Sequence, residues 1–347
     1  MKQKRIIKLG DNRLIGDSYK PYIVAELNTS HFGNISIAKK MIKKAKESGC
    51  DCVKLQSWKS DTLYSKDFLY KNPISKKFFD KYSLNNNQLK ILSTYAKKIG
   101  ISFSSTPYSE DEVNFLVKEC NPAFIKVASM DLNNHLFLKF IAKKKTPVVL
   151  STGMGTLDEI EIAVKLLVSY GQKNICILHC VSLYPLDYKI ANLKNIAMLR
   201  KKFRNIPVGY SDHSIGTTVP VSSVALGACL IEKHFTLDNN KIGMDNHMAT
   251  EPNDMKKMTT ECQIAFNSLG NEKRKLDKKE INQRKKMRRS IFVRESLKKN
   301  EKITLEKLIL RRPGSGIPPN KISKLLGKKV KRNITKNTLL KISDIVI

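Results

Sequence analysis

The sequence predicts an α/β protein made of a (β/α)8 barrel followed by a small β-rich module. Eight strand-sized apolar runs, each ending in polar residues, recur along the first 270 residues, and helix-sized segments separate them. Strands that alternate with helices pair in parallel, and eight of them are the number that closes a barrel. After residue 271 the alternation stops, and short β-like runs with glycine and proline turns follow.

The strands of the predicted barrel are short runs of mostly apolar residues. In chain order they cover residues 22–26, 52–56, 101–106, 124–129, 147–152, 175–179, 206–213 and 230–234. Helical periodicity occupies residues 36–48, 87–98, 109–118, 136–144, 158–169, 192–203 and 217–227, and the amphipathic segment 255–269 completes the ring. Barrels of this kind carry their reactive side chains at the carboxyl ends of the strands. The polar ends of the runs are therefore the candidate site residues.

The structural alternative is a doubly wound open sheet. That fold usually places a G-x-G-x-x-G fingerprint after its first strand. Residues 26–33 read Glu-Leu-Asn-Thr-Ser-His-Phe-Gly and lack it, so the barrel is favoured.

One connection is too long for an ordinary barrel loop. Residues 57–87 contain several aromatic residues and separate the second strand from the next helix. A segment of this length is expected to cover the barrel mouth as a substrate lid.

The chain is expected to divide into three parts. Residues 1–270 form the catalytic barrel, the charged run 271–289 forms a linker, and residues 290–347 form the small module. A module of that size has little core of its own, and packing on a partner surface would help it.

The net charge of +33 raises nucleic-acid binding as a first hypothesis. Residues 271–347 hold 25 Lys and Arg against 7 Asp and Glu, an excess of 18, and the first 270 residues carry only +15. Lysine dominates, spread over helix-like faces, which is typical of a solvated surface. We therefore expect no nucleic-acid partner, and a nonspecific polyanion-binding face is the alternative.

The sequence also predicts where the protein works. No apolar run approaches the roughly 20 residues that cross a bilayer, and the N-terminus shows no export signal. The seven cysteines are scattered, mostly in apolar runs, as reduced core thiols are. We expect a cytoplasmic location and no membrane association.

Two histidines close apolar runs and form the strongest candidate metal site. His213 and His234 end the seventh and eighth predicted strands. Neutral imidazoles with open coordination positions suit manganese, magnesium or zinc, among which spacing does not choose. Hydrogen-bonded structural histidines are the alternative.

Lys54 and Lys126 lie inside apolar strands, where an unpaired ammonium group is costly. A phosphate or carboxylate ligand, or else a structural ion pair, is expected to meet them. Hydroxyl donors for such a ligand stand at neighbouring strand ends, at Thr106, Ser129, Ser151, Thr152 and Ser211. Glu26 ends the first strand as a candidate acid or base, with a salt bridge to a strand lysine as its alternative.

At these positions the chain resembles the sialic acid synthase family over essentially its whole length. The motifs that carry the resemblance are Ala25-Glu26, Val53-Lys54-Leu55-Gln56, Ser105-Thr106-Pro107, Lys126-Val127-Ala128-Ser129, Leu150-Ser151-Thr152-Gly153, Tyr184-Pro185, Gly209-Tyr210-Ser211-Asp212-His213 and Glu232-Lys233-His234. The module with Arg311-Arg312-Pro313-Gly314 is similar to the family's antifreeze-like (SAF, β-clip) domain. The resemblance implies a TIM barrel followed by that domain.

The resemblance also implies a reaction. Phosphoenolpyruvate would condense with an N-acyl hexosamine, either N-acetylmannosamine or a diacetamido-trideoxyhexose. The products would be a nine-carbon 2-keto sugar acid and phosphate. Such a nonulosonic (sialic) acid synthase is a transferase of the EC 2.5.1 type that serves surface polysaccharide or glycan biosynthesis.

Roles follow from the same resemblance, position by position. Glu26, His213 and His234 would be catalytic, and the two histidines would hold a divalent metal, Mn²⁺ first, with Mg²⁺ or Co²⁺ as alternatives. Phosphoenolpyruvate would be bound by Lys54, Thr106, Lys126, Ser129, Ser151 and Ser211. The sugar would be bound by Gln56, Tyr184, Asp245 and Arg312, the last from the partner's module in a domain-swapped homodimer.

Departures from the family pattern leave the sugar open. Ser182 stands where family members often have Asn, and residues 243–248 and the loop 57–87 match poorly. Neuraminate, legionaminate and pseudaminate products are all compatible. A related octulosonate or heptulosonate type synthase is one functional alternative, and a non-catalytic polyanion- or polysaccharide-binding protein is another.

Overall fold

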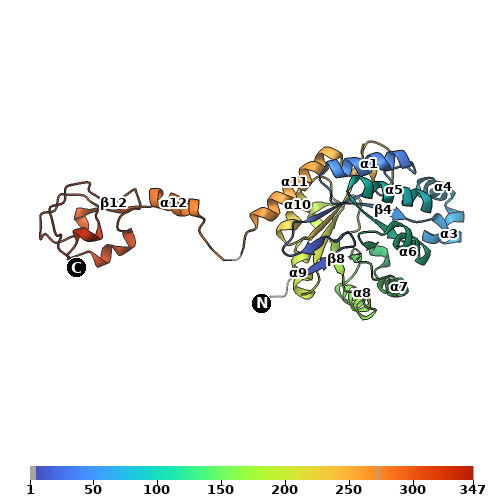
Figure 1. Ribbon diagram of the computed structural model, residues 1–347, viewed down its shortest axis with the longest axis horizontal. Helices are drawn as coiled ribbons and strands as arrows, with labels where there is room; N and C mark the ends of the chain where they lie inside the picture. The colour runs from blue at the N-terminus through green and yellow to red at the C-terminus, as the bar shows by residue number, and fades with distance from the viewer. Residues whose placement is uncertain (1–4, 272, 347) are drawn as a thin grey trace. The chain divides into compact units, whose positions relative to one another are not determined.

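The computed structural model describes residues 5–271 and 273–346, which divide into two units, residues 1–270 and 271–347. The first unit is a closed barrel of eight parallel strands surrounded by helices (Figure 1), as the sequence predicted. The strands are β3 (Tyr22–Glu26), β4 (Cys52–Ser57), β5 (Ser102–Pro107), β6 (Ile125–Val127), β7 (Val148–Ser151), β8 (Ile175–Cys180), β9 (Val208–Asp212) and β10 (Leu230–His234). Strand β10 pairs with β3 and closes the barrel.

The helices of the barrel pack on the outer face of these strands. They are α1 (Ile35–Glu47), α5 (Asn86–Ile99), α6 (Glu110–Phe115), α7 (His135–Lys143), α8 (Leu157–Ser169), α9 (Lys194–Lys202), α10 (Thr218–Ala225) and α11 (Pro252–Ser268). Local sequence sets their ends: the Asn34 side chain caps α1 and Gly100 ends α5 in the left-handed conformation. Helix α6 continues into a π-helical turn, Leu116–Cys120.

Side chains alternate between the two faces of each strand and so form two cores. Outward residues such as Ile231 join the core between strands and helices. Inward residues near the amino ends of the strands, such as Val24 and Leu230, form a second core inside the barrel.

A hairpin at the N-terminus closes the amino end of the barrel. Strands β1 (Ile6–Lys8) and β2 (Leu14–Gly16) pair antiparallel, and Ile7, Leu9 and Ile15 join the inner core. No strand was predicted here from the sequence. Because apolar side chains fill the amino end, only the carboxyl end is left for a site.

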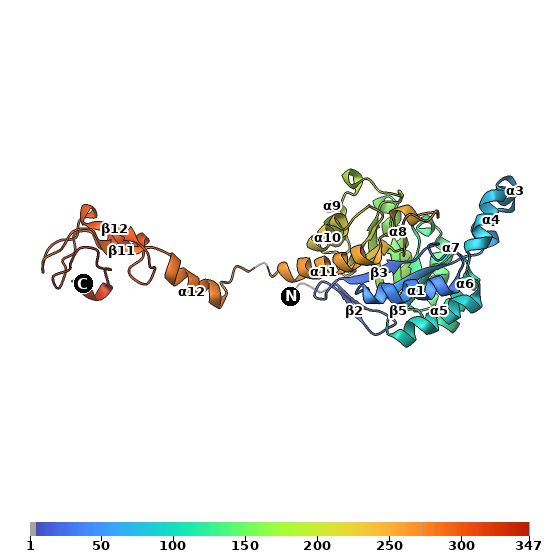
Figure 2. The same ribbon diagram turned by 90° about the horizontal axis from the view of Figure 1, so that it is seen from above.

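The long connection after β4 folds into three short helices. They are α2 (Ser60–Leu63), α3 (Lys66–Lys71) and α4 (Pro73–Tyr82). Trp58, Leu69 and Phe79 form a small core of their own, and Figure 2 shows α3 and α4 standing out from the barrel.

The second unit has a separate core. Within the charged run expected to be a linker, residues Lys278–Met287 form helix α12, which buries none of its residues. Strands β11 (Ser290–Val293) and β12 (Leu308–Arg311) pair antiparallel. Short 3-10 turns (Leu305–Lys307, Pro319–Lys324 and Ile342–Asp344) complete the unit. Ile291, Val293, Val330 and Leu340 are fully buried in its core.

No helix among the described residues combines the length and apolar character that crossing a membrane requires.

Candidate active site

A cavity of about 280 Å³ opens at the carboxyl ends of the barrel strands. Twelve of the thirteen residues given roles by the family resemblance line it: Glu26, Lys54, Gln56, Thr106, Lys126, Ser129, Ser151, Tyr184, Ser211, His213, His234 and Asp245. Thr152, a further hydroxyl predicted to face the ligand, does not line it and donates to the Leu178 carbonyl oxygen. Tyr108, Ala128, Met130, Met154, Cys180, Ser182 and Glu232 line the cavity as well. The thirteenth residue, Arg312, belongs to the C-terminal unit, where it follows β12.

Strand geometry explains why these side chains meet. Glu26 lies opposite Lys54 on one neighbouring strand and opposite His234 on the other. Because successive residues of a strand point to opposite faces, Glu232 must share the inward face with His234. Neighbouring strands thus place the Glu26 and Glu232 carboxylates close to the Lys54 ammonium group at the carboxyl end of the barrel.

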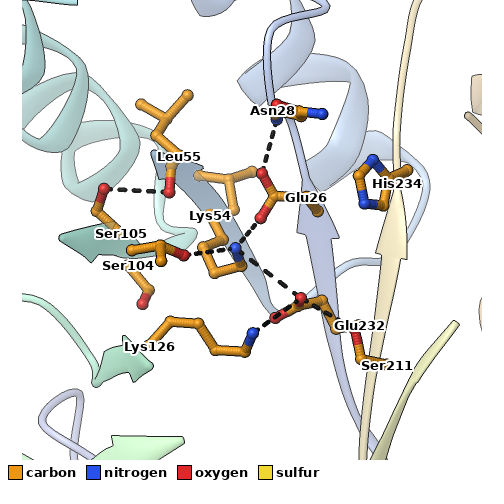
Figure 3. A network of polar contacts seen from close by, with 12 residues as sticks. Glu26, Asn28, Lys54, Leu55, Ser104, Ser105, Lys126, Ser211, Glu232 and His234 are labelled. Atoms are coloured by element: carbon orange, nitrogen blue, oxygen red, sulfur yellow. Dashed lines mark hydrogen bonds and ion pairs between the residues drawn. The ribbon is translucent and has the colours of Figure 1, made fainter. Parts of the chain in front are cut away.

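The floor of the cavity is a network of buried charged and hydroxyl side chains (Figure 3). We define it as Glu26, Lys54, Thr106, Lys126, Ser211 and Glu232. The Lys54 ammonium contacts the Glu26 carboxylate and donates to Thr106 Oγ1 at 2.9 Å. Glu232 Oε1 lies 3.4 Å from Lys126 Nζ and 3.9 Å from Lys54 Nζ, and it accepts from Ser211 Oγ at 3.2 Å. None of these residues is more than 4% exposed.

Burial and neighbouring charges shift the pKa values in the floor. Burial raises the pKa of Glu26, against the opposing effect of Lys54. Burial also lowers the pKa of Lys126, against the opposing effect of Glu232. For Lys54, the two carboxylates outweigh burial and raise the pKa. For Glu232, the two ammonium groups outweigh burial and lower the pKa.

Three buried oxygen atoms of this cavity have no hydrogen-bond partner among the described residues. One is Glu26 Oε2, which contacts the Lys54 ammonium group as an ion pair, and the other two have no such contact. They are Ser151 Oγ and Glu232 Oε2. Buried polar atoms are nearly always satisfied in native proteins, so each unpaired atom here points to a missing ligand. Lys126 likewise has only Glu232 within 4.0 Å as an anionic partner among residues 5–271 and 273–346.

The two histidines stand side by side next to the floor. Their ring centroids are 5.4 Å apart, with planes at 77°. His213 Nδ1 donates to the Val181 carbonyl oxygen at 2.8 Å, which leaves Nε2 with its lone pair. Burial lowers the pKa of His213 and, together with neighbouring cations, holds that of His234 well below its usual range. Both imidazoles are therefore neutral at pH 7.

A pair of neutral imidazoles in a polar cavity fits a divalent metal ion. No set of three or more His, Cys, Asp or Glu ligands occurs in the described part of the chain. A metal held by His213 and His234 would thus take its remaining ligands from water or substrate.

The rim of the cavity consists mostly of loop residues and differs from the floor. We define it as Gln56, Tyr108, Met130, Met154, Ser182, Tyr184 and Asp245. The Tyr184 ring lies 4.1 Å from that of His213. Asp245 accepts from the Asn28 amide, lies 4.0 Å from His234, and has its pKa raised by burial.

Sequence reasoning missed several residues of the cavity. Glu232 was treated only as a polar flank of His234, although the period of two along β10 places it inward with that histidine. Tyr108, Met130 and Met154 lie in loops and carry no comparable signal. His179, near the end of β8, points out of the barrel and contacts the Ala191 carbonyl oxygen at 2.8 Å.

Comparison with known proteins agrees with the whole of this architecture. The NeuB family model matches residues 41–274, and the SAF domain model matches residues 288–346. The N,N'-diacetyllegionaminic acid synthase of Legionella pneumophila is 35% identical over 96% of this chain and 98% of its own. The N-acetylneuraminate-9-phosphate synthase of Mus musculus is 34% identical over 93% and 92%. A crystal structure of the N-acetylneuraminic acid synthetase of Leptospira borgpetersenii superposes with a TM-score of 0.76 at 31% identity, covering 82% of this chain and 96% of that one.

Proposed function

The chain belongs to the NeuB family and ends in a SAF domain, and on that premise we propose that it condenses phosphoenolpyruvate with the open-chain aldehyde of an N-acyl hexosamine. The products are a nine-carbon 2-keto sugar acid and phosphate. The observation that carries the proposal is a cavity in which two buried lysines and the unpaired Ser151 hydroxyl group face two neutral imidazoles.

The floor is suited to phosphoenolpyruvate. Lys54 and Lys126 supply positive charge, and Thr106 and Ser211 supply hydroxyl groups. Ser129 and Ser151, which also line the cavity, supply two more hydroxyl groups. A phosphate or carboxylate oxygen would satisfy Ser151 Oγ and the remaining donors of Lys126. Charge-assisted hydrogen bonds of this kind are strongest where water is excluded.

The reaction balances with one water molecule. Carbon 3 of phosphoenolpyruvate attacks the aldehyde carbon, and the aldehyde oxygen becomes a hydroxyl group by taking a proton. Water adds at carbon 2, and the bond between carbon 2 and the bridging oxygen breaks as phosphate leaves. Glu26, whose pKa is raised by burial, is the group placed to hold and pass on a proton next to Lys54.

A divalent metal ion, Mn²⁺ first, would be held by His213 and His234. When bound, it would polarise the aldehyde oxygen as a Lewis acid. The two imidazoles lie beside Tyr184 and Asp245, so this assignment puts the aldehyde at the border between floor and rim.

The rim favours a sugar without a phosphate group. Among the described residues lining the cavity, the cationic side chains are Lys54 and Lys126, and both belong to the floor. The rim contributes one charged group, the Asp245 carboxyl. One relative is named for a free product and another of similar identity for a phosphorylated product. Sequence identity therefore does not indicate whether the sugar is phosphorylated, and the charge of the rim is used instead. Within the cavity's own lining, a phosphate group there would face a carboxyl group and no cation.

Arg312 remains a proposed sugar contact from the partner subunit in a domain-swapped homodimer. Its unit has only a small core, and docking on a partner barrel would stabilise it. The oligomeric state in solution tests this part directly: a monomer with full activity would contradict it.

Phosphate release tests the function. We expect release when protein, Mn²⁺ and phosphoenolpyruvate are mixed with N-acetylmannosamine or 2,4-diacetamido-2,4,6-trideoxymannose, and mass spectrometry should find the nine-carbon acid. Release with arabinose 5-phosphate or erythrose 4-phosphate instead would indicate an octulosonate or heptulosonate type synthase. Folded protein silent with every sugar, but binding heparin in a salt-sensitive manner, would favour the polyanion-binding alternative.

A further inference from the structure

We infer that Lys233 is a positioning residue that fixes the spacing of the His213 and His234 imidazoles for metal binding. Lys233 lies outside the cavity, on the outward face of β10, and is 1% exposed. The inference rests on the proposed metal-dependent function.

One ammonium group connects both histidine-bearing strand ends. Lys233 Nζ lies 2.5 Å from Asp212 Oδ2 and also donates to the Ser214 carbonyl oxygen. Asp212 and Ser214 are the two chain neighbours of His213, and Lys233 is itself the neighbour of His234. The backbone on both sides of His213 is thus tied to the residue that precedes His234.

Asp212 extends this connection into a cluster of buried hydrogen bonds. It accepts from the Tyr210 hydroxyl at 3.0 Å, from the Ser214 amide at 3.2 Å and from the Ser214 hydroxyl at 2.9 Å. His213 Nδ1 is held in addition by the Val181 carbonyl oxygen at 2.8 Å. Ring and backbone of His213 are both restrained.

Stability alone is a weak reason for such a pair. Desolvation offsets much of the attraction inside a protein, and apolar replacements of both partners are often as stable. The Lys233–Asp212 pair lies where the two candidate metal ligands leave their strands, which gives it a positional role. Groups that orient metal ligands typically change affinity about 10- to 100-fold when removed.

Binding of Mn²⁺ alone, followed by electron paramagnetic resonance of the free ion, tests the inference on the full-length protein. In the double variant Lys233→Met/Asp212→Asn, both charges are gone and the bonds of residue 212 to Ser214 can persist. We expect its Kd for Mn²⁺ to rise about tenfold, with the protein still folded.

Arg200→Met is the matched control. Arg200 pairs with Asp17 at 2.7 Å and donates to the Gly227 carbonyl oxygen, before β10 begins. Its loss should lower the melting temperature and leave the Kd for Mn²⁺ within twofold.

Three outcomes would overturn the inference. A folded double variant with wild-type Kd removes the role of Lys233 and leaves the proposed function intact. Wild-type protein that binds no Mn²⁺ removes the inference together with the metal proposal. If the double variant does not fold, Ser214→Ala replaces it. This change removes the hydrogen bonds from the Ser214 hydroxyl to Asp212 and leaves no buried charge unpaired. An unchanged Kd for Mn²⁺ in Ser214→Ala also overturns the inference.

Discussion

The floor and the rim of the cavity are built in different ways. The floor side chains come from strands of a closed barrel, where pairing and register fix each position, and they are almost fully buried. The rim side chains come mostly from the loops after these strands, and Met130, Met154 and Tyr184 are 53%, 73% and 46% exposed. Under the proposed function, the phosphoenolpyruvate half of the site is built from strands and the sugar half is built mostly from loops.

The largest effect is expected at the border between the two regions. His234→Ala should reduce kcat/KM about a thousandfold or more, because a catalytic metal ion contributes several kcal/mol to the transition state. Turnover and Mn²⁺ binding should be lost together while the fold is kept. His179→Ala is the control, since His179 faces away from the cavity; it should retain turnover. A fully active His234→Ala variant would remove the metal assignment.

The next effect concerns the buried side chain of His31. Burial lowers the pKa of His31 to about 4, whereas the unfolded chain has an ordinary histidine pKa of about 6.5. Between pH 6.5 and pH 4, His31 is protonated in the unfolded chain and stays neutral in the native protein. The free energy of unfolding is therefore not reduced by His31 above pH 6.5, and it falls as the pH drops toward 4. The loss approaches about 3 kcal/mol.

Denaturant titrations at pH 7 and pH 4.5 measure this loss. His31→Asn should show a smaller decrease in the free energy of unfolding between the two pH values. An identical decrease in wild type and variant would show that other groups cause it.

In the floor, Lys126→Met should raise the KM for phosphoenolpyruvate about 10- to 100-fold, the value of one hydrogen bond to a charged group. The KM for the sugar should change little. Because the variant leaves Glu232 without its nearest cation, Lys126→Met/Glu232→Gln serves as the control. A KM restored by the second change would mean that Glu232, and not the lost lysine, caused the defect.

The smallest effect is expected at the rim. Met154→Lys places a cation beside the sugar and should raise the preference for N-acetylmannosamine 6-phosphate over N-acetylmannosamine up to about fivefold, as expected of an exposed ion pair. Met154→Leu should not change this ratio. A wild-type enzyme that already prefers the phosphorylated sugar would contradict the neutral-sugar proposal.

The same contrast explains what the sequence could predict. Strand ends are recognisable because apolar runs stop at polar residues, and this located Glu26, Lys54, His213 and His234. Glu232 was within reach of the same reasoning, because a period of two along β10 is enough to place it. The N-terminal hairpin was missed because its apolar residues are few and interrupted by charges.

The rim and the second unit were less predictable for a physical reason. Loop conformation depends on distant packing, so nothing near Tyr108 or Met154 in the sequence indicates that they line the cavity. The helix α12 has charged residues all round and no buried side chain, which gives it no hydrophobic period to detect.

In the part of the chain that the structure describes, the hairpin fills the amino end of the barrel, and the cavity opens at the carboxyl ends of the strands. Ile7, Leu9 and Ile15 occupy the place where a second opening would be. Under the proposed assignment, phosphoenolpyruvate lies on the floor and the sugar lies above it. The order of events follows: phosphoenolpyruvate binds first, the sugar second, and phosphate leaves only after the sugar acid has left. Product-inhibition kinetics should therefore show phosphate competing with phosphoenolpyruvate for the free enzyme.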